Sequence, residues 1–135
     1  MTYRKADIRP YRPDDEPLLF GLASLDRGAD RRTLAVLEGE TVFVADVEGD
    51  PAGYVALERA GDIVRVDQLF VSPEHEAEGV GKQLLEFAEG YAIAEGATTL
   101  QVVVASDDRR ASAFYRGRGF VGAGDDLLEL VLPHA

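Results

Sequence analysis

The sequence of 135 residues contains no cysteine and no tryptophan, and its only histidines are His75 and His134. Without cysteine the chain can form no disulfide, no zinc–thiolate site and no cysteine nucleophile. Two histidines are too few for a metal site built from several imidazoles. We therefore expect no metal cofactor.

Lysine is scarce as well, because Lys5 and Lys82 are the only two, and the formal net charge is −11. A surface of this sign repels nucleic acid phosphates and anionic lipid headgroups, and it attracts cations. We expect no nucleic acid partner and no membrane association. The acidity suits a cationic amine as substrate, and it is equally compatible with a role in solubility alone.

Long apolar runs are missing too, and the charged segment Met1–Pro10 lacks the apolar core of a signal peptide. These absences predict a cytoplasmic location. Apolar residues still make up 46% of the chain, which is enough for one sizeable core at this length. Because no repeat or linker divides the sequence, we expect a single domain over residues 1–135.

Patterns in the first half predict helices followed by an antiparallel meander. Helical spacing of leucines gives way to alternating apolar residues, and clusters of turn residues separate the alternating segments. The predicted elements are a short strand over Thr2–Arg9, a helix starting at Arg12–Glu16, a second helix over Arg31–Leu37, and strands over Thr41–Val47, Ala52–Arg59 and Ile63–Val71.

The second half predicts a long amphipathic helix, a valine-rich strand, a short helix and a last strand. The continuous apolar run of the valine-rich strand favours burial on both of its faces. Ser106 or Asp107 can cap the short helix. The predicted bounds are Gly79–Glu95 for the long helix, with Gly96 as its C-cap, Leu100–Ala105 for the valine-rich strand and Leu127–Leu132 for the last strand, while Gly119–Phe120 closes the short helix.

The third meander strand, the long helix and the valine-rich strand form a β-α-β unit, whose outer strands should be parallel. The predicted fold class is therefore α/β (α+β). It has a mixed central sheet with an antiparallel meander, one parallel β-α-β crossover and helices on both faces.

The turn between the third meander strand and the long helix carries the strongest chemical signal. Gly79 and Gly81 open the helix one residue apart. Free N–H groups at a helix start converge on anions, and glycine lets the backbone approach a pyrophosphate. Taken alone, the pair is equally compatible with a turn or packing role. It is neither a nucleotide P-loop nor a dinucleotide fingerprint, because the Gly-Lys-Ser/Thr and the third glycine are missing.

Two motifs together resemble those of the GNAT acyltransferases. The first resembles the family's acyl-CoA-binding signature and reads Leu69–Phe70–Val71–x–Pro73, then Gly79–Val80–Gly81–x–x–Leu84–Leu85. The second resembles the family's other hallmark at every fixed position and reads Ala111–x–x–Phe114–Tyr115–x–x–x–Gly119–Phe120. The resemblance covers Thr41–Phe120, and each motif lies on the element that it requires.

The resemblance implies an acyl-CoA N-acyltransferase that moves an acetyl group from acetyl-CoA to a primary amine of a small molecule or peptide by direct attack. It places the pyrophosphate at the Gly79–Gly81 turn and an oxyanion-binding N–H around Phe70–Val71. Tyr115 becomes the acid that protonates the departing thiolate, with a core tyrosine as the alternative. The implied cofactor-binding residues are Leu69, Phe70, Val71, Glu76, Ala77, Glu78, Gly79, Val80, Gly81, Lys82, Asp108, Ala111 and Phe114.

Two aspartates have competing interpretations. Asp67 lies near the position where relatives place a carboxylate that relays a proton from the amine, so it is the candidate base, but Arg65 on the same strand face can neutralise it instead. Asp108 stands where many relatives have an asparagine that contacts the coenzyme, and helix capping is an equally good explanation.

The turn itself departs from the family's pattern. Relatives usually have Arg or Gln at position 76, Gly at 77 and often a basic residue at 78, where this chain has Glu76, Ala77 and Glu78. At about 7 Å in water, each carboxylate repels a pyrophosphate by about half a kcal/mol, and by less in salt. We expect binding to survive in weakened form. His75 replaces a residue that is commonly aromatic in relatives, and we expect it to be exposed to solvent.

The acceptor amine is not identified by the sequence. The resemblance assigns its selection to the N-terminal helices and the loops over the cleft, here Leu18–Glu38 and the last hairpin, and it is compatible with a homodimer. A non-catalytic acyl-CoA-binding regulatory module of the same fold is the main alternative, and Glu76 and Glu78 favour it. A nucleotide-binding α/β protein is a further alternative.

Overall fold

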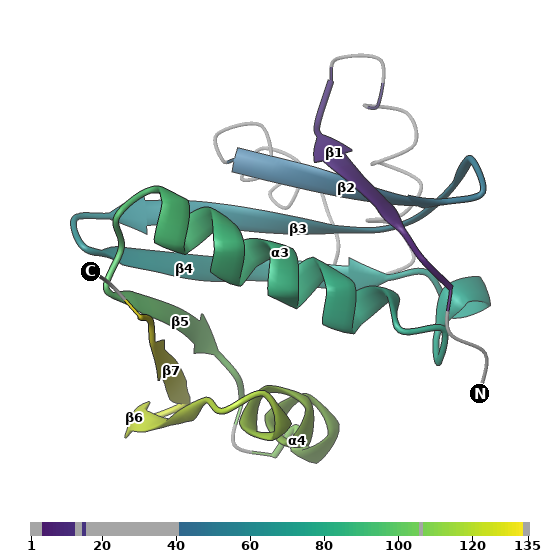
Figure 1. Ribbon diagram of the computed structural model, residues 1–135. Coiled ribbons are helices and arrows are strands. Elements are labelled where there is room, and N and C mark those ends of the chain that lie inside the picture. Colours follow the sequence, from purple (N-terminus) through teal and green to yellow (C-terminus); the bar gives the residue numbers. More distant parts are fainter. Residues whose placement is uncertain (1–3, 13–14, 16–40, 106, 134–135) are drawn as a thin grey trace. The chain divides into compact units, whose positions relative to one another are not determined.

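The computed structural model describes residues 4–12, 15, 41–105 and 107–133. Within them, seven strands form one mixed sheet in the order β1-β2-β3-β4-β5-β7-β6 (Figure 1). The predicted helices at Arg12–Glu16 and Arg31–Leu37 lie almost wholly outside the described residues. The expectation that they cover one face of the sheet therefore stays a prediction. The strands are β1 (Asp7–Pro10), β2 (Thr41–Val47), β3 (Asp50–Ala60), β4 (Ile63–Val71), β5 (Thr99–Val103), β6 (Val121–Gly124) and β7 (Leu127–Val131).

The chain divides into two compact units, which are residues 1–57 with 68–88 and residues 58–67 with 89–135. Strands β3 and β4 and helix α3 (Val80–Ala94) contribute residues to both units. The single domain expected over residues 1–135 stays a prediction.

In the first unit, β1 pairs with β2 and β2 pairs with β3, all antiparallel. Strand β4 lies next to β3 in the sheet and is joined to it by the two residues Gly61 and Asp62, a connection that only antiparallel strands allow. The predicted antiparallel meander of β2, β3 and β4 is therefore confirmed. The first turns of α3 pack on these strands, where the rings of Phe43 and Phe87 lie 4.6 Å apart. Leu84 and Leu85 are fully buried, and each such leucine contributes about 1.5–3 kcal/mol by leaving water.

Strand β1 begins later than predicted, at Asp7 instead of Thr2. The preceding backbone groups that the structure describes are bound elsewhere. The Arg4 N–H donates to the Glu78 carbonyl at 2.9 Å, and the Gln83 amide accepts from the Ala6 N–H at 2.8 Å and donates to the Arg4 carbonyl at 2.6 Å. One glutamine side chain on α3 thus takes the place of a strand partner.

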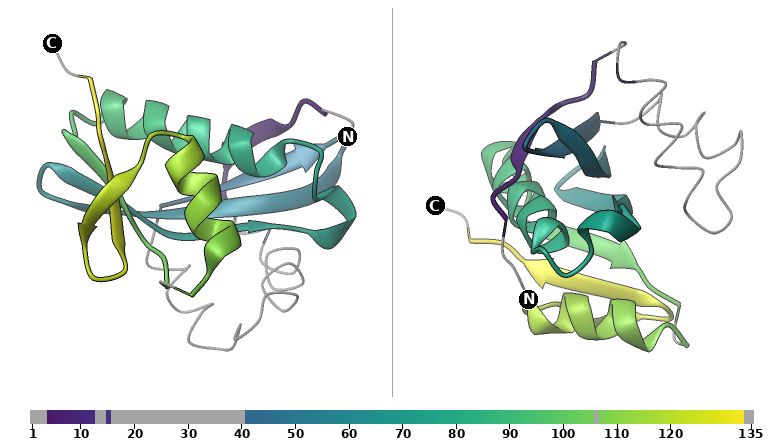
Figure 2. Two further views of the ribbon diagram at one scale, coloured as in Figure 1. Left: turned by 90° about the horizontal axis from the view of Figure 1, so that it is seen from below. Right: turned by 90° about the vertical axis from the view of Figure 1, so that its right-hand side faces the viewer.

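In the second unit, β4 and β5 are parallel, and the residues Ile63–Val66 pair with Thr99–Val102. This pairing confirms the predicted parallel crossover. Strand β7 pairs antiparallel with both β5 and β6. Helix α4 (Arg109–Gly117) lies beside the β6–β7 hairpin (Figure 2). The fold class is therefore the one predicted, a mixed sheet with one parallel crossover.

The prediction that the valine-rich strand is buried on both faces was wrong. Leu100 and Val102 are 0% and 4% exposed, whereas Val103 is 63% exposed. The strand therefore alternates and has a single core face, and its run of valines concealed that alternation. The predicted C-cap of α3 is confirmed, because Gly96 has φ 79° just beyond the helix.

Candidate functional site

The residues of the first motif form one continuous strand–turn–helix segment of the first unit. Strand β4 ends at Val71, a 3-10 turn follows at Pro73–His75, and α3 begins at Val80. The Gly79 carbonyl accepts a hydrogen bond from the Gln83 N–H at 3.1 Å, which closes the first turn of the helix. The structure brings together ten of the thirteen predicted cofactor-binding residues here, which are Leu69, Phe70, Val71, Glu76, Ala77, Glu78, Gly79, Val80, Gly81 and Lys82.

The first turn of α3 is suited to bind an anion. A helix leaves its first N–H groups without intrahelical acceptors, and its dipole places about half a positive charge at that end. Gly79 has φ 83°, a left-handed conformation that glycine adopts without strain. Gly81 is half-buried and Lys82 is exposed. The backbone N–H groups of these residues are therefore suited to bind a phosphate group, and the charge of Lys82 lies in the same turn of the helix.

Ala77 also adopts a left-handed conformation, with φ 67°, which costs a residue with a Cβ about 1–2 kcal/mol. We expect Ala77→Gly to raise the free energy of unfolding by about 0.5–1 kcal/mol, because relief of this strain outweighs the entropy that glycine adds to the unfolded chain. Urea denaturation measures the change. Gly79→Ala is the matched control and should lower stability, and a loss of stability in Ala77→Gly would contradict the interpretation.

The Glu78 carboxylate is neutralised within the turn. Its Oε2 atom lies 3.0 Å from the Arg4 guanidinium, and its Oε1 atom lies 2.9 Å from Nδ1 of His75. The side chain is only 17% exposed. The Arg4 guanidinium therefore offsets the repulsion expected between Glu78 and a pyrophosphate, and His75 adds a hydrogen bond to the same carboxylate. Glu76, in contrast, is exposed on the surface of the turn.

The expectation that His75 is exposed to solvent was wrong. Its side chain is 12% exposed and lies between two carboxylates, with Nε2 2.6 Å from Asp50 and Nδ1 2.9 Å from Glu78. The hydrogen bond to Asp50 raises the pKa of His75 above its ordinary value, with a further contribution from Glu78, while burial opposes the shift. The imidazole thus links the start of β3 to the turn.

The end of β4 approaches β3 unusually closely. A Cβ atom on Gly53 would lie 2.3 Å from the Phe70 carbonyl oxygen, so only glycine fits at that position. The Ser72 N–H donates to the Ala52 carbonyl at 2.7 Å just beyond. Next to this point the buried Tyr54 hydroxyl donates to Gln68 at 2.7 Å. These contacts fix the backbone of the predicted oxyanion-binding segment.

The sequence interpretation missed this role of Gly53 and Tyr54. An isolated glycine inside an alternating strand pattern indicates a bulge or a close backbone approach, and that signal is present in β3. It does not identify the opposing residue, because Phe70 is 17 positions away along the chain.

The remaining predicted residues belong to the second unit. Asp108 accepts a hydrogen bond from the Ala111 N–H at 3.0 Å and is the N-cap of α4. This confirms the capping interpretation of Asp108. The prediction that Asp107 caps the helix was wrong, and Ser106 lies outside the described residues. Ala111 and Phe114 are half-buried on α4.

Asp67 is half-buried on β4, directly after Val66, which is the last residue of β4 that pairs with β5. The alternative interpretation paired it with Arg65. In the part of the chain that the structure describes, these two side chains form no ion pair, and Arg65 is exposed.

Tyr115 is 7% exposed, and its ring lies edge-on against Phe114 at 5.1 Å and Phe120 at 5.4 Å. Burial raises its pKa from the ordinary value of 10.0 to about 12. The hydroxyl therefore keeps its proton throughout the neutral range.

This shift predicts a dependence of stability on pH. The folded chain holds the Tyr115 proton more tightly than the unfolded chain, so the stabilisation is present below pH 10 and is lost as the pH rises towards 12. Over this interval, we expect the wild-type free energy of unfolding to fall by about 2–3 kcal/mol more than that of Tyr115→Phe. Denaturant unfolding at pH 9 to 12 measures the difference, and parallel curves would contradict it.

The α4 end of the second unit carries a cavity of about 620 Å³, lined in part by Ser112, Arg116, Asp125 and Asp126. Gly122, Gly124 and Leu127 of the β6–β7 hairpin line another part of this cavity. None of the described helices is long and apolar enough to cross a membrane.

Comparisons with known proteins give a consistent result. A sequence model of the acetyltransferase (GNAT) family matches residues 6–120. Two uncharacterized N-acetyltransferases are similar in sequence, one of Methanocaldococcus jannaschii at 28% identity over 85 residues and one of Archaeoglobus fulgidus at 31% over 81 residues. The matches cover 58% and 55% of this chain, and they span only 38% and 55% of those proteins.

Solved structures share the fold. The ribosomal-protein-S18-alanine N-acetyltransferase of Escherichia coli superposes with a TM-score of 0.85 at 20% identity and covers 97% of this chain and 96% of its own. A GNAT family acetyltransferase from Elizabethkingia anophelis, crystallised with acetyl-CoA, superposes with a TM-score of 0.82 at 15% identity and covers 94% and 98%.

Proposed function

Because the chain belongs to the GNAT family of acetyltransferases, we propose that it transfers an acetyl group from acetyl-CoA to the primary amine of a small molecule or peptide by direct attack. The observation that carries the proposal is the strand–turn–helix segment from Leu69 to Lys82, whose glycine-opened helix start fits a pyrophosphate. The acetyl-CoA bound in a structural relative supports the choice of donor.

The reaction needs three contributions from the protein, which are a donor for the oxyanion, a base for the amine and a proton for sulfur. We assign the first to a backbone N–H around Phe70–Val71, where the contact with Gly53 fixes the strand. A fixed N–H loses no energy in reorienting as the oxyanion forms. We assign the base to Asp67, which the half-burial of its side chain supports.

We assign the third contribution to Tyr115. A free thiol has a pKa of about 8.5, so complete proton transfer from a tyrosine with a pKa of about 12 is uphill by about 5 kcal/mol. Tyr115 therefore donates a hydrogen bond to the sulfur as negative charge develops on it, the amine gives up its proton to Asp67, and the departing thiolate takes its proton from solvent water. Such a bond is strongest in the transition state and lowers the barrier.

The acceptor is proposed to be cationic before it loses its proton. The net charge of −11 attracts cations, and Asp125 and Asp126 lie on the cavity of the second unit. The segment Leu18–Glu38, to which acceptor selection was also assigned, lies outside the described residues. A homodimer remains a prediction.

Release of free thiol from acetyl-CoA tests the proposal. We expect the protein to release thiol in the presence of one or more members of a panel of amines, polyamines and peptides, at a rate above that without amine. The second candidate is a non-catalytic acyl-CoA-binding module, which the exposed Glu76 favours. Tight acetyl-CoA binding without thiol release across the panel would replace the enzyme with this module.

Charge at position 76 should tune the affinity for acetyl-CoA. Removing the Glu76 carboxylate and adding a guanidinium each contribute about half a kcal/mol at about 7 Å in water, so we expect Glu76→Arg to lower the dissociation constant about fivefold at low salt. Glu76→Gln should give about half of that free-energy change. Calorimetric titration at two salt concentrations checks both values, and an unchanged or weaker affinity would show that the turn does not face the phosphates.

A further inference from the structure

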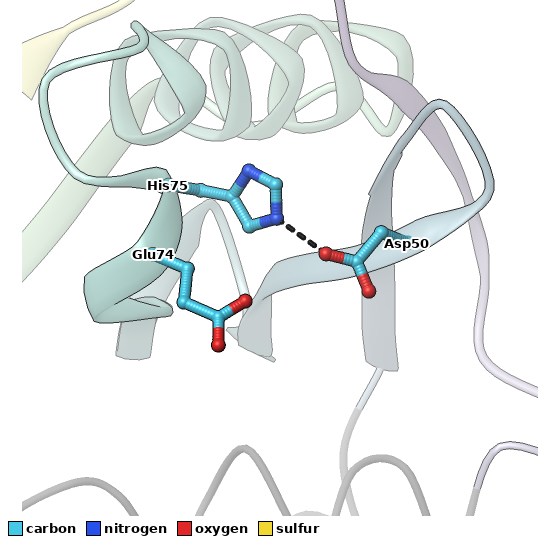
Figure 3. Close-up of side chains that lie close together, drawn as sticks. All are labelled: Asp50, Glu74 and His75. Carbon is cyan, nitrogen blue, oxygen red and sulfur yellow. Dashed lines mark hydrogen bonds and ion pairs between the residues drawn. The ribbon is translucent and has the colours of Figure 1, made fainter.

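We propose that Asp50, Glu74 and His75 form a binding site for a divalent transition-metal ion, with Zn²⁺ as the best-matched ion. One carboxylate oxygen from Asp50, one from Glu74 and a ring nitrogen of His75 all lie within 4.8 Å of one another. Figure 3 shows the three side chains converging from the start of β3 and from the 3-10 turn. All three residues belong to the first unit, and the proposal does not rest on the acetyl-transfer chemistry.

The hydrogen bonds that would orient His75 towards an ion are already present. A metal-bound histidine nearly always donates its other ring N–H to a carboxylate or carbonyl, which fixes the tautomer. Here Nδ1 of His75 lies 2.9 Å from Glu78, and the second oxygen of Glu78 is held by Arg4 at 3.0 Å. With Nδ1 as the donor to Glu78, an ion that binds at Nε2 replaces the proton shared with Asp50, and that proton is released to solvent.

The geometry requires both carboxylates to adjust, because the three ligand atoms are separated by up to 4.8 Å. Zinc bonds of about 2.0–2.1 Å place two tetrahedral ligand atoms about 3.3 Å apart, whereas Nε2 of His75 lies 2.6 Å from Asp50. Asp50 must therefore withdraw by about 0.7 Å, and its side chain is 57% exposed, so it has the freedom to do so. The third ligand, Glu74, is exposed as well, and water can complete the coordination.

The donor set selects the class of ion. Mg²⁺ and Ca²⁺ prefer oxygen ligands alone, whereas an imidazole nitrogen with carboxylates suits Zn²⁺ and its neighbours in the transition series. Two carboxylates and a neutral imidazole also carry enough negative charge to balance a divalent ion. Binding would tie the start of β3 to the turn that precedes α3.

Calorimetric titration of the full chain with ZnCl₂ tests the site, and the absence of cysteine removes competing thiolates. We expect one ion per chain with a micromolar dissociation constant, and no competition from a tenfold excess of Mg²⁺. His75→Gln should weaken binding at least tenfold. His134→Gln is the matched control, because the chain has only these two histidines, and it should bind as the wild type does.

Two further measurements keep the test decisive if His75→Gln folds poorly. Asp50→Asn and Glu74→Gln change exposed side chains, and each should weaken binding at least threefold. In ¹⁵N-labelled protein, Zn²⁺ should shift the Nε2 resonance of His75 and leave the ring of His134 unchanged. Equal affinity in the wild type and all three variants, a shift confined to His134, or no saturable binding below 1 mM Zn²⁺ would overturn the proposal.

Discussion

Replacement of Tyr115 by phenylalanine is expected to lower kcat by about 100-fold or more, with little change in the KM for acetyl-CoA. The substitution removes only the hydroxyl, and the ring contacts with Phe114 and Phe120 remain available. A hydrogen bond made only to the developing thiolate contributes to the transition state and not to the bound substrate, so its loss appears in kcat.

Tyr91→Phe is the matched control for this measurement. Tyr91 lies on α3, away from the α4 residues of the second motif, and its hydroxyl donates to the exposed Glu95 at 3.4 Å. Both variants lose one tyrosine hydroxyl, and steady-state thiol release should separate them by two orders of magnitude. A Tyr115→Phe enzyme with the kcat of Tyr91→Phe would remove Tyr115 from the reaction.

A methyl group added at Gly53 should be the most damaging small change in the first unit. It would stand 2.3 Å from the Phe70 carbonyl oxygen and within 3.3 Å of Leu84 and of the Val71 backbone. Because the Phe70 carbonyl oxygen belongs to the backbone, this clash is relieved only if β3 and β4 move apart. We expect Gly53→Ala to lower the free energy of unfolding by about 1–3 kcal/mol.

The same displacement moves the segment that we assign to oxyanion binding, so we expect kcat/KM to fall at least tenfold under conditions where the protein remains folded. Gly90→Ala is the control, because a Cβ there meets nothing within 4 Å and alanine favours a helix interior by about 0.5–1 kcal/mol. Thermal unfolding and kinetics of both variants check the pair. Wild-type stability in Gly53→Ala would contradict the close approach of the strands.

The parts of the fold that depend on local pattern could be predicted from the sequence. The bounds of α3 were predicted to within one residue at each end, because its apolar face is periodic and Gly96 ends it. The meander followed from alternation and turn clusters. The bounds of β6 were not predicted, because its sequence Val-Gly-Ala-Gly has little strand preference and it forms through pairing with β7.

The parts of the site that depend on contacts distant in the sequence could not be predicted. Glu78 looked like a source of repulsion in the turn, because its partner Arg4 lies 74 residues earlier in the chain. His75 looked like a surface residue for the same reason, since Asp50 lies on another element. The motif thus predicts which backbone groups meet the anion, whereas the ion pairs of the acidic side chains around it depend on tertiary structure.

The central claim is that the backbone around Gly79 and Gly81 binds the pyrophosphate of the acyl donor. Titration of ¹⁵N-labelled protein with coenzyme A, followed through the backbone amide resonances, tests it most directly. We predict that the Gly79, Val80 and Gly81 amides shift together and saturate at one coenzyme per chain. Saturable binding that leaves these three amides unmoved, or no binding at all, would contradict the claim.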